Sequence, residues 1–265
     1  MNGTFARHLL LLLAISGSMI LVAADRGRED LLDDDDRKEI ALLGSDVMGD
    51  SVELGPIAKA SDWLPLAERK STFKFTSGDD RGKTVVMTEH YTKDNKQNPK
   101  GHTGPSWVIT DPKTNVSYIQ QDKDGNLHMP TQVDLSQKVV STFDPPEPIL
   151  LEGVKPGESR TTDIKVEVYD ISDPDTVSHS GSMKATYTDL GGFKITVPAG
   201  TWDARLVRTT YEGKIGPASV SDSVYRFYAK GVGCIAAIDR SHISAFLVYN
   251  KSSNVGRILM KEPTG

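Results

Sequence analysis

The chain has little that could cross-link it. It contains one cysteine among 265 residues, so no disulfide can form within it. The fold must therefore depend on its apolar core, even in an oxidising compartment. Cys234 lies in the apolar run 233–238, where an unpaired cysteine is more often a small buried hydrophobe than a nucleophile.

Long apolar runs are also scarce. Leu9–Val22 is almost wholly apolar, but it is shorter than the ~20 residues that a membrane-spanning helix needs. Arg7 precedes this run and Val22-Ala23-Ala24 ends it ahead of Asp25, a pattern typical of a cleaved secretory signal peptide. We predict a signal peptide over 1–24 and a periplasmic or extracellular protein with no membrane span after cleavage.

A surplus of positive charge is absent as well. Residues 25–54 hold eleven acidic and four basic side chains, whereas residues 55–265 are nearly balanced, with 25 acidic and 26 basic ones. With no basic stripe, we predict no nucleic-acid partner. We interpret 25–58 as an acidic, partly ordered leader, with one short helix over 33–44, and 59–265 as a single antiparallel β domain.

The sequence also lacks the common catalytic motifs. No Gly-x-Ser-x-Gly elbow, phosphate-binding loop, His-Glu-x-x-His pair or dinucleotide fingerprint occurs, and the six histidines are isolated. The run 122–126 begins like a calcium-binding loop, but Leu127 stands where glycine is required, so a hairpin turn is expected there. We therefore assign no catalytic residue, no metal ligand and no cofactor.

The clearest pattern that is present is a hairpin over 193–208. Apolar and polar residues alternate on both sides of Pro198-Ala199-Gly200. Proline presets φ for the turn and glycine supplies a positive φ. Phe193, Ile195 and Val197 should therefore share one face of the hairpin, together with a set of apolar residues from the second strand (Trp202, Ala204 and Leu206).

Other alternating segments predict further strands. The run 135–143 leaves strand and helix open, and the proline-rich run Asp144–Pro148 is interpreted as a break between two halves of the sheet. The expected strands are 71–76, 83–91, 106–110, 116–121, 127–129, 161–170, 182–189, 221–229, 233–238, 244–250 and 256–260. This pattern predicts a mainly β fold: a curved antiparallel sheet, as a half-barrel or a sandwich, with one or two short helices.

Two late strands carry large apolar side chains on both faces. The segments 224–228 and 245–249 lack the clean alternation of a sheet with one wet side, so both of their faces should be covered, by another sheet, a helix or a ligand. We select Tyr225, Phe227, Phe246 and Val248 as candidate ligand-binding residues.

Three segments carry a resemblance to a known group of proteins. Trp63-Leu64-Pro65-Leu66, Val197–Ala204 and Tyr228–Gly233 resemble exported bacterial β-rich proteins, similar in layout to the half-barrel carriers of lipoprotein localisation. The resemblance covers roughly residues 60–260 and its motifs are turns. It implies a curved sheet with a concave apolar face and no catalytic residues. This chain differs in having no cysteine for lipidation after the signal peptide.

These observations lead to one main functional hypothesis with two alternatives. The main hypothesis is an exported binding or envelope protein that holds an apolar or lipid-like ligand in the concavity of its sheet. The first alternative is a structural or protein-interaction module with a filled sandwich core. The second is a hydrolase whose site the sequence does not reveal. A pocket with convergent polar groups would favour the hydrolase, and a filled core without a cavity would favour the module.

Overall fold

The computed structural model describes residues 31–93, 104–245 and 249–265, and the side chains of 243–251 lie outside the description. Within these ranges, one thirteen-stranded antiparallel sheet contains every strand. The strands are β1 (Met48–Val52), β2 (Arg69–Phe75), β3 (Thr84–Thr92), β4 (Ser106–Asp111), β5 (Asn115–Gln121), β6 (Leu127–Asp134), β7 (Val139–Leu150), β8 (Ser159–Asp170), β9 (Asp173–Val197), β10 (Gly200–Ile215), β11 (Ala218–Ala229), β12 (Gly233–Ala245) and β13 (Tyr249–Leu259). The helices are α1 (Asp34–Ile40) and the 3₁₀ turns η2 (Ala41–Leu43) and η3 (Ala60–Asp62).

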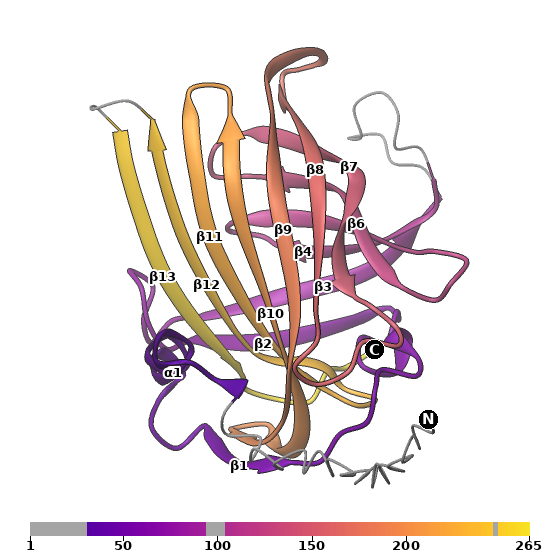
Figure 1. The fold of residues 1–265 in the computed structure, drawn as a ribbon, viewed down its shortest axis with the longest axis vertical. Coiled ribbons are helices and arrows are strands. Elements are labelled where there is room, and N and C mark those ends of the chain that lie inside the picture. The colour runs from indigo at the N-terminus through magenta and orange to yellow at the C-terminus, as the bar shows by residue number, and fades with distance from the viewer. Residues whose placement is uncertain (1–30, 94–103, 246–248) are drawn as a thin grey trace, which may run out of the picture.

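The sheet closes into a barrel of twelve strands, β2–β13, each paired with its neighbours in the chain. Closure comes from three residue pairs between the first and last strands, Arg257 with Phe75, Ile258 with Lys74 and Leu259 with Phe73. In Figure 1, β9–β13 stand upright in front while β2–β4 cross behind them. The expected mainly β fold is confirmed, but the half-barrel and the sandwich are both wrong, because the two edges of the curved sheet pair with each other.

Two strand assignments need correction. The expected break at Asp144–Pro148 is instead the middle of β7, which runs unbroken over twelve residues. The prolines lack N–H groups, and the pairing of β7 with β6 shifts register there, between Thr142 and Glu147. The expected strand 244–250 is wrong in its bounds, because 244–245 end β12 and 249–250 begin β13, with 246–248 outside the described residues; the expected strand 256–260 is the end of β13.

The predicted hairpin over 193–208 is confirmed as the β9–β10 hairpin. Val197 pairs with Gly200, and Gly200 has a φ of 154°. A Cβ atom at Gly200 would lie 2.8 Å from the indole of Trp202, so the turn leaves no room for a side chain there. The expected apolar face packs into one buried cluster (Phe193, Ile195, Val197, Ala204 and Leu206, with Trp202 against it).

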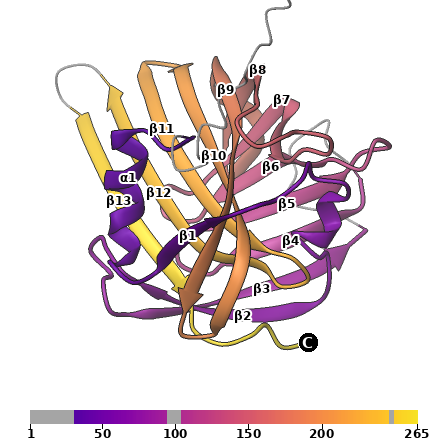
Figure 2. The same cartoon turned by 60° about the horizontal axis from the view of Figure 1, so that its bottom comes forward.

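The acidic segment before the barrel forms α1 as expected and covers the outside of the barrel. Asp33 caps the helix in a capping box with Asp36, and Gly44, with a φ of 119°, follows the η2 turn. Figure 2 shows α1 across the outer face of β11–β13. Leu32, Ile40 and Leu43 are buried there against the strands, so this segment is the outer cover.

A second segment fills one end of the barrel interior. Residues 57–64, which we call the plug, bury Ile57, Trp63 and Leu64 in the apolar cluster of the interior. The Ala60 N–H donates to Glu152 at 2.8 Å, and the Asp62 carbonyl accepts from the Gly231 N–H at 2.7 Å in the β11–β12 turn. Among the described residues, no helix has the length and apolarity to cross a membrane.

Candidate functional site

The two described candidate residues lie on the outer face of β11. Side chains alternate along a strand, so Val224, Arg226 and Tyr228 point into the barrel while Tyr225 and Phe227 point outward. Both outward residues are buried, with exposed fractions of 3% and 0%. The expectation that this strand is covered on both faces is therefore confirmed. A ligand contact by Tyr225 or Phe227 stays a prediction, and neither lines the cavity described below.

The other two candidates, Phe246 and Val248, lie outside the described residues. The structure therefore brings together one pair of the four predicted ligand-binding residues. This pair contacts protein from the N-terminal segment rather than open space.

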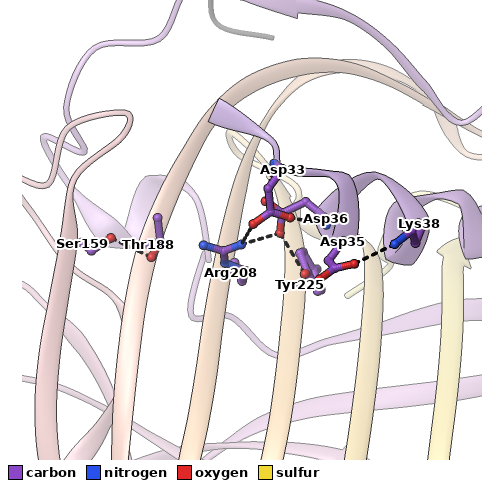
Figure 3. A network of polar contacts seen from close by, with 8 residues as sticks. All are labelled: Asp33, Asp35, Asp36, Lys38, Ser159, Thr188, Arg208 and Tyr225. Carbon is purple, nitrogen blue, oxygen red and sulfur yellow. Dashed lines mark hydrogen bonds and ion pairs between the residues drawn. The ribbon is translucent and has the colours of Figure 1, made fainter. Parts of the chain in front are cut away.

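A buried polar network joins Tyr225 to α1 (Figure 3). The Asp36 carboxylate is fully buried, accepts from the Tyr225 hydroxyl at 2.9 Å and pairs with Arg208 at 2.6 Å. Burial and the hydrogen bond to Asp36 both raise the pKa of Tyr225 well above its usual range. The hydroxyl of Tyr225 thus donates to the carboxylate, and the network fixes the outer cover to β10 and β11.

The barrel interior contains a partly open cavity of about 560 Å³. It extends along β10 from Val207 to Ile215, and eight residues of strand correspond to about 26 Å. Several of its lining side chains, including Asp222, Arg226 and Asp239, are only half-buried, so solvent reaches them. A volume of this order falls within the range of ordinary small-molecule sites, ~300–1,000 Å³.

Part of the cavity wall is continuous with the apolar interior around the plug. Leu64 of the plug lines the cavity, and so do apolar side chains from the strands around it (Ile119, Met129, Phe143, Val166, Met183 and Val207). Behind them, Arg205 lies over the ring of Trp63 at 5.0 Å and pairs with the buried Asp189. This part of the wall can take an apolar group.

Another part of the wall is charged. Arg226 on β11 pairs with Asp239 on β12 at 2.5 Å, and Arg69 on β2 pairs with Glu89 on β3 at 2.9 Å. Arg226 and the nearby Arg257 hold the pKa of Asp239 below its usual range despite burial. Arg257 lies 3.6 Å from carboxylate oxygens of both Asp111 and Asp239. Arg69, Arg226 and Arg257 therefore each face at least one carboxylate.

Glu147 is a buried acid of the cavity wall with a strongly raised pKa. It projects from β7, is 8% exposed, and accepts a hydrogen bond from the hydroxyl of Tyr211 on β10. Burial raises the pKa of Glu147 to about 7, while the Tyr211 hydrogen bond and Arg226 act in the opposite direction. Burial likewise raises the pKa of Asp222 on β11, the direct cross-strand neighbour of Tyr211. With a pKa of about 7, Glu147 can exchange a proton near neutral pH.

Cys234 lies on the same wall, half-buried rather than fully buried. Its thiol donates to the carbonyl of Ala236 at 3.4 Å, and burial raises its pKa. A raised pKa keeps the thiol protonated and poorly nucleophilic. Among the described residues, no group of three or more His, Cys, Asp or Glu side chains is arranged to hold a metal ion.

Sequence reasoning missed the charged wall. Glu147 lies in the proline-rich run that we interpret from the sequence as a break, so it gave no sign of a site. Tyr211 and Asp222 lie in ordinary strand patterns. One signal was available: in β11, the alternate residues Asp222, Val224, Arg226 and Tyr228 place two charges on the same face of the strand as apolar and aromatic side chains. Charges on such a face indicate a polar interior rather than an apolar core.

Comparisons with known proteins give a distant likeness only. No protein family matches the sequence, and no curated protein matches it either. Two solved structures are similar over 80% of this chain and 100% of theirs, each with a TM-score of 0.41. One is a candidate lipoprotein from Parabacteroides distasonis at 14% identity, and the other is a candidate exported protein with a YmcC-like fold from Bacteroides fragilis at 11%. Likeness at this level does not establish a shared function.

Proposed function

We propose that this chain is an exported binding protein that holds one amphipathic, lipid-like small molecule inside its barrel. The observation that carries the proposal is the cavity of about 560 Å³, lined by apolar side chains near the plug and by charged ones elsewhere. A structural module with a filled core would leave no such space. A wholly apolar ligand is a poorer fit, because it would displace water from charged groups without replacing their hydrogen bonds.

The test is binding of a neutral, lipid-like fluorescent probe, N-phenyl-1-naphthylamine, whose emission rises in apolar surroundings. The parent protein should bind it saturably at one site. Val224→Trp places an indole on the cavity wall of β11 and should weaken binding about tenfold or more, since it fills space that the probe needs.

The matched control is Ser221→Trp, which adds the same indole to the exposed outer face of β11. It should bind the probe as the parent does. A second cavity variant, Ser241→Trp on β12, guards against misfolding of the first, and thermal unfolding checks that each variant is folded. No saturable binding by the parent, or equal binding by the parent and both folded cavity variants, would overturn the proposal.

A further inference from the structure

We infer that the polar head of the cavity ligand is a primary ammonium group, bound between the carboxyls of Glu147 and Asp222. The inference rests on the proposed function and specifies its ligand class. It depends on the positions of these two side chains in the cavity and on which charges of the wall are already paired.

Both carboxyls flank one tyrosine. Tyr211 and Asp222 are directly opposite each other on β10 and β11, so their Cβ atoms are about 5 Å apart on the same face. The Tyr211 hydroxyl donates to Glu147 across the cavity from β7. All three side chains line the cavity. An ammonium group beside the tyrosine hydroxyl would therefore have two carboxyls within reach.

Three arginines of the wall already face carboxylates, whereas Glu147 and Asp222 face no basic side chain in an ion pair among the described residues. Arg69, Arg226 and Arg257 each face a carboxylate of Glu89, Asp239 or Asp111. In the described part of the chain, no ion pair joins a basic side chain to Glu147 or Asp222. Glu147 is more than nine-tenths buried, points into the cavity and accepts only from a neutral hydroxyl among its described contacts. A buried acid without a counter-charge leaves a place for a cation.

The surroundings of the pair favour a cation over an anion. Glu147 interacts with Tyr211 through a hydrogen bond and electrostatically with Asp222, Arg226 and Tyr228. Of these, Arg226 is already paired with Asp239. Asp222 accepts hydrogen bonds from the backbone N–H of His242 at 2.9 Å and from the Ser241 hydroxyl. Asp239 raises the pKa of Asp222 and the His242 side chain lowers it. The pKa of both carboxyls is raised because burial outweighs the opposing effects of Arg226 on Glu147 and of His242 on Asp222, and neither carboxyl has an ion-pair partner among the described residues. An ammonium ligand would supply that partner and would donate hydrogen bonds to carboxylate oxygens.

The experiment compares decylamine, decanol and decanoate, which share one chain and differ in head charge, as competitors of bound N-phenyl-1-naphthylamine. In the parent, decylamine should displace the probe at about tenfold lower concentration than decanol, and decanoate should be the weakest. Glu147→Gln and Asp222→Asn, which keep size but remove charge, should each bring decylamine close to decanol and leave decanol unchanged. The control Glu212→Gln, exposed next to Tyr211 on the outer face of β10, should keep the tenfold preference.

The outcomes separate this inference from the proposed function. If decylamine and decanol displace the probe equally from a parent that binds it, the inference of an ammonium head is wrong, while the proposal of binding in the cavity still stands. Strongest displacement by decanoate would also overturn it and would point to Arg257, whose buried Nε has no hydrogen-bond partner among the described residues. A parent that does not bind the probe would defeat the proposed function itself. Because two separate carboxyls are tested, misfolding of one variant still leaves the other to decide.

Discussion

Replacing Glu147 by Gln should change how stability depends on pH. In the unfolded chain this carboxyl titrates at its ordinary pKa of 4.5, whereas in the folded barrel burial raises the pKa to about 7. Between these values the folded protein binds the proton more tightly than the unfolded chain does. The stabilising contribution of the protonated carboxyl is therefore fully present below the unfolded pKa and is lost as pH rises through the folded pKa.

The size of the effect follows from the two pKa values. A rise from 4.5 to about 7 corresponds to roughly 3 kcal/mol of unfolding free energy that is lost between about pH 4 and about pH 8. Glutamine keeps the shape of the side chain and does not titrate. The free energy of unfolding of the parent minus that of Glu147→Gln should thus fall by roughly 3 kcal/mol over this range.

Urea denaturation of both proteins at several pH values measures this difference. The subtraction largely removes the other acids with shifted pKa values, such as Asp189 and Asp239, because both proteins contain them. Glu212→Gln, an exposed acid on the same hairpin arm as Tyr211, provides the control and should give a difference that is flat with pH. A flat difference for Glu147→Gln as well would refute the reasoning, since it would mean that water or a base compensates the carboxyl.

Four further predictions test other parts of the molecule. Gly200→Val should destabilise the fold by about 1–3 kcal/mol in thermal unfolding, because its Cβ atom would meet Trp202; an unchanged melting temperature would contradict the turn geometry. Phe227→Ala should cost about 3–5 kcal/mol and leave probe affinity unchanged; weaker probe binding would instead make Phe227 a ligand contact. Asp36→Ala should cost on the order of 3 kcal/mol and speed amide hydrogen exchange in α1, because Arg208 loses its buried partner. The exported protein should begin at Asp25 by intact mass, and a mass that retains 1–24 would refute signal-peptide cleavage.

Local features of the fold were predictable because each depends on a few neighbouring residues. The β9–β10 turn follows from Pro198 and Gly200, and the α1 helix follows from its capping aspartates and the glycine after it. The turn at Asp122–Asn126, expected in place of a calcium loop, is confirmed between β5 and β6, where Gly125 has a φ of 89°. In all three cases the chemistry of the turn or cap acts within one short segment.

Closure of the barrel could not be predicted in the same way. It depends on pairing between β2 and β13, which are separated by most of the chain and joined by only three residue pairs. The alternation of a strand is the same whether its sheet closes or stays open, because each strand has two neighbours except at an edge. The prediction of a break in β7 was wrong for a related reason. Three prolines remove backbone hydrogen-bond donors from a strand, but they do not end it where a shift in register, as in a bulge, lets pairing with β6 continue.

The site was harder to predict than the fold. Apolar residues on both faces of a strand indicate that both faces are covered, but they do not show which face points into the barrel. On β11 the predicted ligand-binding residues Tyr225 and Phe227 face the outer cover, and the cavity is on the other side of the strand. What distinguishes the two faces is charge. Where the outer cover lies on β11, the outer face presents Tyr225 and Phe227, and Asp36 accepts from the Tyr225 hydroxyl, whereas the inner face keeps Asp222 and Arg226 beside apolar residues. Charges on a buried face are costly unless they are paired or hydrated, so they indicate a polar interior rather than a filled apolar core.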